Sequence, residues 1–467
     1  MMSRSGPILC VALALAASGC SSDRAPAPPT SASRSAASSA SSASSEAPTS
    51  GVIPQPDAPA DLAVADESTR ADLAMPTFSD PTAITNPLFP VSSQQSVLLL
   101  GTVDDQPFRT EVTLLPTTRV LEWEGQQVET LVSQYVAFLD GRIQEVAYDL
   151  YAQADDGSVW YFGEDVFNFA DGAIVDTHGT WIAGVDGPAA MIMPADPQVG
   201  DVYRPENIPG FVFEEVTVQS VGETLDGPLG SVEGGTIIHE LHMDGATEDK
   251  TFAPGYGEFY TGGGGDVEAL AMAIPTDAAS EAVPTELETL ATGGMDAIDA
   301  TASEDWAAAT SAADEVSAAW EAFASAHDVP RLIEPLMAGA VEALGSAVAD
   351  EDADRGGQAA IEVARMAFDL QLRHRAQVEI ELARFDLWLA QLRLDAAAGD
   401  AALVNGDHFA LDYVRERFVH SLDPADTAGI NLALEELLGA IGDEDYAAVE
   451  EISAMLREVV AEVSPSP

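Results

Sequence analysis

Aromatic rings beside a carboxylate form the first group of residues that could bind a ligand. The run Trp160-Tyr161-Phe162-Gly163-Glu164 is followed by Trp181. Side chains of a strand alternate between its faces, so Tyr161 is expected to point away from its two aromatic neighbours. Tyr161, Glu164 and Trp181 are a candidate binding group for a small molecule or a glycan, because aromatic faces with a nearby carboxylate suit such ligands. The preferred interpretation is that these rings fill the core and pack across strands, and the binding role is the alternative.

Two histidines and a glutamate in His239-Glu240-Leu241-His242 have the residue types of a metal site. The spacing differs from the HExxH pattern, in which two histidines share one face of a helix. On a strand, His239 and His242 would point to opposite faces. We therefore predict no metal at this motif.

The motifs of nucleophilic enzymes are missing from the sequence. It contains no Gly-x-Ser-x-Gly turn, and no histidine has an evident serine partner. Scattered carboxylates identify no acid/base pair in so acidic a chain. We expect no catalytic residue, no cofactor and no enzymatic activity; an unrecognised hydrolase of the cell envelope is the alternative.

The C-terminal part of the chain has five arginines in a segment of fewer than thirty residues: Arg365, Arg373, Arg375, Arg384 and Arg393. The expected role of these guanidinium groups is to pair with neighbouring carboxylates such as those of Glu379 and Glu381. The sharper alternative is that Arg373, Arg375 and Arg384 form a docking site for an acidic ligand, a protein partner or the preceding domain.

Cys20 is a candidate site of lipid attachment. Arg4 precedes an apolar run, residues 8–17, that is too short to span a bilayer, as in a signal peptide. Ala17-Ser18-Gly19-Cys20 resembles the lipobox of bacterial lipoproteins, so we expect cleavage before Cys20 and acylation of its thiol; an ordinary secretory signal is the alternative. Because Cys10 leaves with the signal, the mature chain has no disulfide. The expected location is the extracytoplasmic face of the cell membrane.

Composition divides the remaining chain into segments. Residues 1–19 are the signal peptide, and residues 20–75, rich in Ser, Ala, Pro and Asp, are predicted to be a lipidated disordered tether. Residues 84–275 are rich in Val, Thr, Tyr, Trp and Gly, whereas residues 303–464 are rich in Ala, Leu and Glu. Residues 276–302 read as a linker between these two domains.

The first domain is predicted to be antiparallel β. Residues 129–138, 142–151 and 235–243 alternate apolar and polar side chains at period two. Asp-Gly pairs such as Asp140-Gly141 and Asp171-Gly172 suit the tight turns between such strands. The spacing predicts a meander of ten to twelve strands that forms a sandwich or a curved sheet.

Several ordered motifs of this domain resemble a family of secreted or lipid-anchored bacterial proteins whose activity is not established. The resemblance covers about residues 86–274 and implies a compartment and a domain boundary. The sequence departs from the family pattern at Ala154, beside the Asp156-Gly157 turn, and at Pro188-Ala189. The matching motifs are Tyr151-Ala152-Gln153, Asp156-Gly157-Ser158-Val159-Trp160-Tyr161-Phe162-Gly163-Glu164, Trp181-Ile182-Ala183-Gly184-Val185-Asp186-Gly187, Met193-Pro194, Val199-Gly200-Asp201 and Phe252-Ala253-Pro254-Gly255-Tyr256-Gly257.

The second domain is predicted to be an all-α bundle of six or seven antiparallel helices. Apolar residues recur at helical spacing, for example Val316, Trp320 and Phe323. Residues 378–394 carry two apolar stripes, which indicates a central helix. Three junctions, near Asp350, Asp400 and Asp443, place a small residue before an acidic N-cap. The fold class is therefore α+β with two domains.

The formal charge of −59, with a single lysine, limits the function. Such a surface repels nucleic acid and anionic lipid headgroups, so the membrane is expected as a partner only through the lipid anchor. The expected function is a binding module for a ligand or cell-wall component, with the bundle docking a protein partner. A scavenger or sensor of divalent cations is the alternative, although a GC-rich genome and solubility also account for the acidity.

Overall fold

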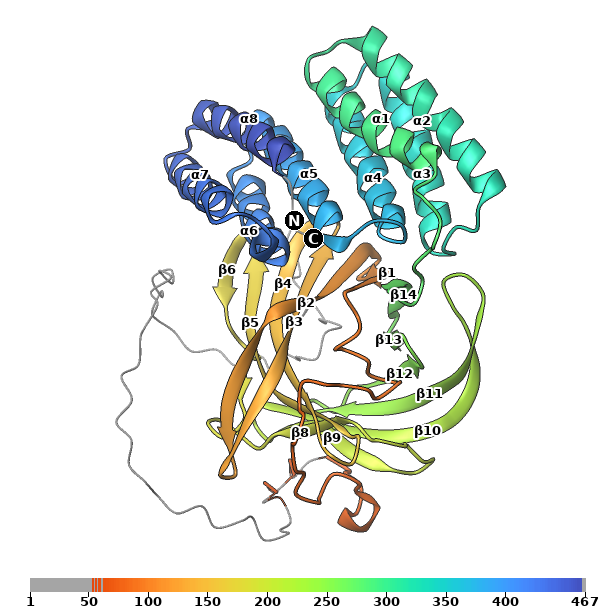
Figure 1. Cartoon of the computed structure of the whole chain (residues 1–467), viewed down its shortest axis with the longest axis vertical. Coiled ribbons are helices and arrows are strands. Elements are labelled where there is room, and N and C mark those ends of the chain that lie inside the picture. The colour runs from red at the N-terminus through yellow and green to blue at the C-terminus, as the bar shows by residue number, and fades with distance from the viewer. Residues whose placement is uncertain (1–52, 54, 57, 60–61, 464–467) are drawn as a thin grey trace, which may run out of the picture.

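A large antiparallel sheet is followed by eight α-helices in the described part of the chain (Figure 1). The computed structural model describes residues 53, 55–56, 58–59 and 62–463. The strands are β1 (Ser96–Val103), β2 (Gln106–Trp123), β3 (Gln126–Leu139), β4 (Arg142–Gln153), β5 (Val159–Ala170), β6 (Ala173–Asp176), β7 (Trp181–Ile182), β8 (Ala190–Met193), β9 (Val202–Ile208), β10 (Val212–Asp226), β11 (Ser231–His242), β12 (Thr247–Ala253), β13 (Gly257–Gly263) and β14 (Asp266–Ile274).

The predicted fold class is confirmed, with a curved open sheet as the β architecture. Strand order is β6-β5-β4-β3-β2-β1-β14-β13-β12-β11-β10-β9, so almost every neighbour in the sheet is also a neighbour in the chain. The predicted Asp-Gly turns are present, and Asp140 and Gly141 both have positive φ, 48° and 74°. The prediction fell short of the fourteen strands because segments as short as β7 show no period.

The two ends of the sheet approach one another. Strands β7 and β8 both pair with β5, and β8 also contacts β9. The indole N–H of Trp181 on β7 donates to Oε1 of Glu206 on β9 across 3.1 Å. The sheet therefore curves around an interior and has two distinct faces, one inside and one outside.

The helices form two groups of four. Helix α1 packs on α2 and α4, and α3 on α4; α5 packs on α6 and α8, and α7 on α8. No helix in the described part of the chain is long and apolar enough to span a bilayer. The helices are α1 (Thr285–Ala302), α2 (Trp306–Ala326), α3 (Ile333–Ala349), α4 (Ala353–Gln371), α5 (Gln377–Ala398), α6 (Ala401–Phe418), α7 (Pro424–Gly442) and α8 (Tyr446–Glu462), with 3₁₀ turns η1 (Glu67–Thr69) and η2 (Val419–Ser421).

Four helix junctions share one backbone motif. At each, a residue of positive φ (Glu304, Glu351, Gly399 or Glu444) is followed by an aspartate N-cap. At the first junction Asp305 N–H donates to the carbonyl of Ala300, and Glu304 N–H to that of Thr301, which is a Schellman arrangement. The acidic N-caps predicted near Asp350, Asp400 and Asp443 are confirmed as Asp352, Asp400 and Asp445. The junction at Asp305 was missed.

Residues 276–302 were expected to be a linker, and this expectation is wrong for most of the segment. The junction at Asp305 was missed for the same reason. Helix α1 occupies Thr285–Ala302 and belongs to the first four-helix group. Its Gly293-Gly294 pair has low helix propensity but lets neighbouring helices approach closely. A Cβ on Gly293 would lie 2.7 Å from the Val316 side chain, and one on Gly294 would lie 3.0 Å from that of Ala364. Tertiary packing thus overrides the local preference.

The end of the expected tether also packs on the sheet. Ile53 N–H donates to the carbonyl of Leu73, and Ala71 N–H donates to that of Val202 on β9. Buried Arg70 forms an ion pair of 2.6 Å with Asp72. The prediction of disorder for residues 20–75 is therefore wrong for their described C-terminal part, because a few apolar and paired charged residues dock there against β9.

Helices cover part of the outer face of the sheet (Figure 1). Phe138 on β3 stacks on Trp388 of α5 with ring centroids 5.4 Å apart, and Phe169 on β5 meets Phe409 of α6 at 5.2 Å. Leu98 on β1 packs with the first helix group. In this part of the sheet both faces are buried, one against helices and one toward the interior, whereas elsewhere the outer face is exposed, as at Val120 of β2.

Six buried charges join sheet and helices at this interface. Arg417 of α6 contacts Glu111 of β2 at 2.5 Å and Glu381 of α5 at 3.3 Å. Burial alone would raise the pKa of Glu111, but the guanidinium groups of Arg384, Arg109 and Arg417 hold that pKa well below its ordinary value. With Asp369, which accepts from both Arg109 and Arg384, the group contains three arginines and three carboxylates, so it is electrically balanced.

Candidate functional site

A cavity of about 100 Å³ lies inside the curved sheet. Eight strands that are neighbours in the sheet line it, in the order β5-β4-β3-β2-β1-β14-β13-β12. Strand β4 shows how alternation builds the wall: the odd-numbered residues 145–151 face the cavity, whereas Val146 packs against the helices. The lining residues are Phe89, Val91, Gln94, Val97, Leu99, Val112, Leu114, Ser133, Tyr135, Glu145, Ala147, Asp149, Tyr151, Glu164, Lys250, Tyr256, Gly257, Glu258 and Glu268.

The lining combines apolar and aromatic surface with an unusual density of carboxylates. Glu145, Asp149, Glu164, Glu258 and Glu268 all reach the cavity wall, together with one ammonium group. Oε1 of Glu164 and Oε1 of Glu268 have no hydrogen-bond partner among the described residues, although both side chains are buried. A cavity of this volume holds several water molecules or a compact ligand group.

The structure brings Tyr161, Glu164 and Trp181 together, but only Glu164 lines the cavity. The Tyr161 and Trp181 rings meet edge to face at 5.3 Å and are fully buried, and Trp181 is the register partner of Glu164. The Tyr161 hydroxyl donates to Asp149 Oδ1 across 2.8 Å. The two rings do not line the cavity: they are core residues behind its wall, as in the preferred interpretation, and they position its carboxylates.

Gly163 allows this arrangement. Its φ of 112° and its position beside Trp181 exclude a side chain, because a Cβ would lie 2.0 Å from the Trp181 carbonyl oxygen. The irregular backbone between Tyr161 and Glu164 interrupts strict alternation. Strand β5 can therefore bury residues on both faces and still direct the Glu164 carboxylate inward.

Burial alters the protonation of the cavity carboxylates. It raises the pKa of Asp149 to about 7, although the hydrogen bond from Tyr161 acts in the opposite direction. Burial and the neighbouring Glu258 raise the pKa of Glu268 to about 8. For Glu164, burial followed by the charges of Glu206 and Asp149 raises the pKa well above its ordinary value. At neutral pH Glu268 is therefore largely protonated and Asp149 about half protonated.

These shifts predict that the protein loses stability as the pH rises from 5 to 8.5. Asp149 and Glu268 bind protons in the folded state up to pH 7–8, whereas the unfolded chain releases them near pH 4. Their stabilising contribution is complete below pH 4 and is lost as the pH passes the folded pKa values, with a slope approaching −1.4 kcal/mol per pH unit for each group. Chemical denaturation at half-unit steps of pH measures this slope.

The variant Glu268→Gln should have a shallower slope than the wild type, because a neutral amide replaces the titrating acid. Glu124→Gln is the matched control, since Glu124 is exposed in the β2–β3 turn. Equal slopes for Glu268→Gln and the wild type would contradict the assignment.

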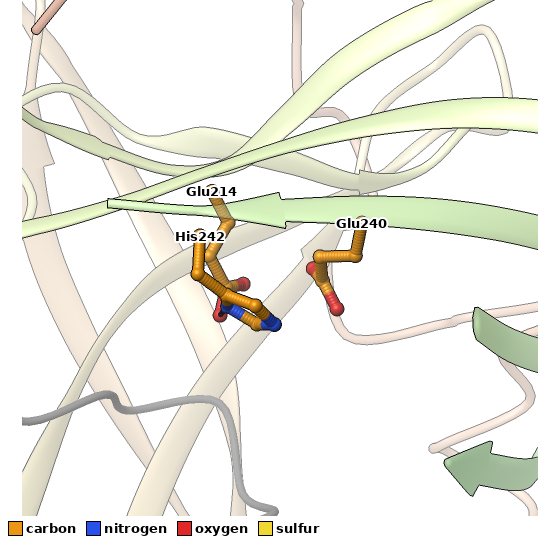
Figure 2. A group of neighbouring side chains, drawn as sticks. All are labelled: Glu214, Glu240 and His242. Carbon is orange, nitrogen blue, oxygen red and sulfur yellow. Dashed lines mark ion pairs between the residues drawn. The ribbon is translucent and has the colours of Figure 1, made fainter. Parts of the chain in front are cut away.

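A second polar cluster adjoins the cavity through Lys250, the single lysine of the chain. Its Nζ lies 2.6 Å from Glu240 Oε2 and 3.2 Å from Glu248 Oε1. On the far side, His242 Nδ1 lies 3.2 Å from Glu214 Oε1, and its Nε2 lies 3.5 Å from Glu248 Oε1. Figure 2 shows Glu214, Glu240 and His242 directed to one side of β10 and β11.

The five groups of this cluster balance their charges. Burial lowers the pKa of His242, but hydrogen bonds to Glu214 and Glu248 raise it to about 10. Burial would raise the pKa of Glu248, yet Lys250 and His242 hold it at about 2. Burial and the Glu214 charge raise the pKa of Glu240 to about 8. With Glu240 protonated at neutral pH, two cations face two carboxylates.

His239 and His242 lie on opposite faces of β11, as their spacing predicted, but the contact of His242 with Glu214 was not foreseen from the sequence. His239 is partly exposed and pairs with Asp249 at 2.8 Å, on the face opposite His242. However, Glu240 and His242 are two residues apart and share a face, and Glu214 is the cross-strand partner of His242. The period of two in the sequence was a signal that Glu240 and His242 share a face. The pairing of His242 with Glu214 depends on the register of β10 and β11.

The candidate docking arginines have partners within the chain. Arg384 is buried and contacts Glu381, Asp369 and the sheet residue Glu111, at 2.8, 2.7 and 4.0 Å. Arg384 therefore contributes to the contact between the helices and the preceding domain, which was the alternative role predicted for it. Arg373 donates to the carbonyl of Asp277.

Arg375 pairs with Glu288 of α1 at 3.0 Å and with Glu379 at 3.4 Å, the latter as expected from sequence. The structure therefore gives each of the three arginines an intramolecular role. Cys20, the predicted site of acylation, lies outside the described residues.

Sequence reasoning overlooked most of the residues that line the cavity. Glu145, Asp149, Glu258 and Glu268 were passed over because carboxylates are abundant throughout the chain. A usable signal was the regular placement of Glu145 and Asp149 on one face of an otherwise apolar strand. The position of the sole lysine was a second signal. Comparison of the chain with protein-family models and with curated proteins finds no match, so the family resemblance of residues 86–274 stays a prediction.

Proposed function

We propose that this protein is a lipid-anchored, extracytoplasmic binding protein whose curved sheet holds a compact organic cation, such as an ammonium or guanidinium group. The observation that carries the proposal is the pair of buried carboxylate oxygens at the cavity, Glu164 Oε1 and Glu268 Oε1, which have no hydrogen-bond partner among the described residues. Buried polar groups without partners are costly, so a donor supplied by a ligand would be stabilising.

The chemistry of the remaining wall supports a positively charged organic ligand. Phe89, Tyr135, Tyr151 and Tyr256 offer ring faces, which attract ammonium and guanidinium groups. Lys250 also lines the cavity, but its ammonium is already paired with Glu240 and Glu248. An entering cation would displace protons from the cavity carboxylates and then gain a charge-assisted hydrogen bond in a site of low dielectric.

A binding role is proposed ahead of catalysis because of the residue types at the cavity. Among the described residues that line it, none is a histidine or a cysteine. The anchor at Cys20 is proposed from the Ala17-Ser18-Gly19-Cys20 sequence, which would hold the binding domain outside the membrane. The strongly negative charge of the chain would raise the local concentration of cations around it.

Isothermal titration calorimetry tests the proposal with choline, ethanolamine and methylguanidine as probes. We expect at least one of them to bind with a stoichiometry near one. For choline, the neutral isostere 3,3-dimethyl-1-butanol separates charge from shape and should bind at least about tenfold more weakly, which corresponds to 1.4 kcal/mol. Glu164→Gln and Glu268→Gln should each weaken binding by a similar factor.

Glu124→Gln is the control for nonspecific electrostatic binding of cations to the acidic surface, and it should leave the affinity unchanged. The proposal fails if none of the three cations binds, or if the neutral isostere binds as tightly as choline. It also fails if a panel of envelope hydrolase substrates is turned over and Glu164→Gln abolishes the turnover, since the cavity would then be an active site.

A further inference from the structure

Three buried metal-ligating side chains meet on strands β10 and β11, beyond the proposed cation cavity. Glu214 faces His242 directly across the strand pair, and Glu240 precedes His242 by two residues on the same face. One ligand atom from each of the three lies within 4.8 Å of the other two. All three side chains are almost completely buried, with exposed fractions of 2%, 1% and 4% for Glu214, Glu240 and His242.

We propose that Glu214, Glu240 and His242 form a binding site for a divalent transition-metal ion, of which Zn²⁺ is best suited. One imidazole nitrogen and two carboxylate oxygens are a ligand set that Zn²⁺ uses, at distances of about 2.0–2.2 Å. Ca²⁺ and Mg²⁺ favour ligand sets of oxygen alone, so the histidine disfavours them.

An unsatisfied oxygen in the cluster supports a ligand at this place. Glu214 Oε2 has no hydrogen-bond partner among the described residues, although its side chain is only 2% exposed. Buried polar atoms are nearly always partnered in native proteins, and coordination of an ion would satisfy this oxygen.

The surrounding charges can accommodate an ion. Glu248 lies 3.5 Å from His242 Nε2 and offers a further carboxylate. A metal ion would take the place of the protons on His242 and Glu240, so its binding releases these protons to solvent. Lys250 contacts Glu240 and Glu248 and therefore competes with a metal for the same oxygens. This competition predicts a lower affinity for Zn²⁺ than that of a zinc site with no neighbouring ammonium.

Calorimetric titration of the chelator-treated full chain with ZnCl₂ tests the site. The titration uses about 0.3 M NaCl, which screens the acidic surface. We expect one Zn²⁺ to bind well above any weak surface background. His242→Ala should lower the affinity by about 100-fold or more, and Glu214→Gln by about tenfold or more, since even groups that only orient metal ligands contribute 10–100-fold. His239→Ala is the matched control on the same strand and should have no effect.

Co²⁺ provides a second readout that does not depend on affinity. The wild type should show visible absorption bands of a low-symmetry site, and these should be lost in His242→Ala and kept in His239→Ala. Should His242→Ala fail to fold, the near-isosteric Glu214→Gln decides. Loss of binding in His239→Ala, or only weak binding of several ions by the wild type, overturns the proposal. Glu268→Gln should retain zinc, which separates this site from the cation cavity.

Discussion

Replacing Arg417 with methionine should lower the free energy of unfolding by about 3–5 kcal/mol, because two buried carboxylates each lose one guanidinium partner and the buried group is left with one excess negative charge. The Arg417 side chain is fully buried and lies 2.5 Å from Glu111 of the sheet and 3.3 Å from Glu381 of α5. It also donates to Gln134 Oε1 on β3 across 2.7 Å. Methionine fills a similar volume but cannot neutralise either carboxylate.

Urea denaturation followed by circular dichroism and by tryptophan fluorescence measures this loss. Arg355→Met is the matched control, because Arg355 also lies in the helical part and pairs with Asp350 and Asp352, but it is largely exposed. The control should cost less than about 1 kcal/mol. If Arg417→Met were no more destabilising than Arg355→Met, the buried group would not contribute as described.

The same variant also tests whether sheet and helices unfold together. Phe138, Trp388, Phe169 and Phe409 form a shared apolar interface across the two parts, so the wild type should unfold in one transition reported equally by both probes. Arg417→Met weakens the polar centre of this interface. A separation of the two probes in the variant alone would show that the arginine group couples the two parts.

Replacing Lys250 with methionine is the second substitution for which we expect a loss of about 3–5 kcal/mol. Its Nζ lies 2.6 Å from Glu240 and 3.2 Å from Glu248, and the residue is 6% exposed. Burial lowers the pKa of Lys250, but the charges of Glu240 and Glu248 raise it well above its ordinary value. The stabilisation is therefore present below about pH 10, the pKa of an unfolded lysine, and is lost only at more alkaline pH.

A double-mutant cycle with Glu240→Gln measures the interaction between the two side chains. The double variant Lys250→Met/Glu240→Gln should be more stable than Lys250→Met alone, because it removes one buried acid together with its partner. The measurements belong at pH 7 in the presence of a chelator, so that no metal ion replaces the ammonium. Additive effects of the two substitutions would contradict a direct interaction.

Local features of the structure were predictable from sequence. The period-two runs over residues 129–138 and 142–151 became β3 and β4, and the Asp140-Gly141 pair became the turn between them. The aspartate N-caps at Asp352 and Asp400 were equally visible. Such features depend on residues a few positions apart, so a single sequence contains the necessary information.

Periodicity did not reveal what the polar face of each strand meets. An alternating strand with one polar face is usually solvated on that face, yet the polar residues of β4 line a cavity and those of β2 and β3 bind arginines of the helices. The alternating sequence pattern is the same whether the polar face of a strand meets solvent, a cavity or the arginines of a helix. Tyr161, Glu164 and Trp181 were therefore grouped correctly in space, but the sequence did not show that only Glu164 reaches the cavity.

The sequence by itself determined most of the strands of this protein, its Asp-Gly turns and several helix N-caps, whereas lipid attachment at Cys20 stays a prediction. Only the tertiary structure decided which acids surround a cavity, which surround Lys250 and which meet an arginine. Arg417 and Glu111 are 306 positions apart, and Arg109 and Asp369 are 260 apart. Partners at such separations are set by strand register and by the docking of helices on the sheet, which local spacing does not encode.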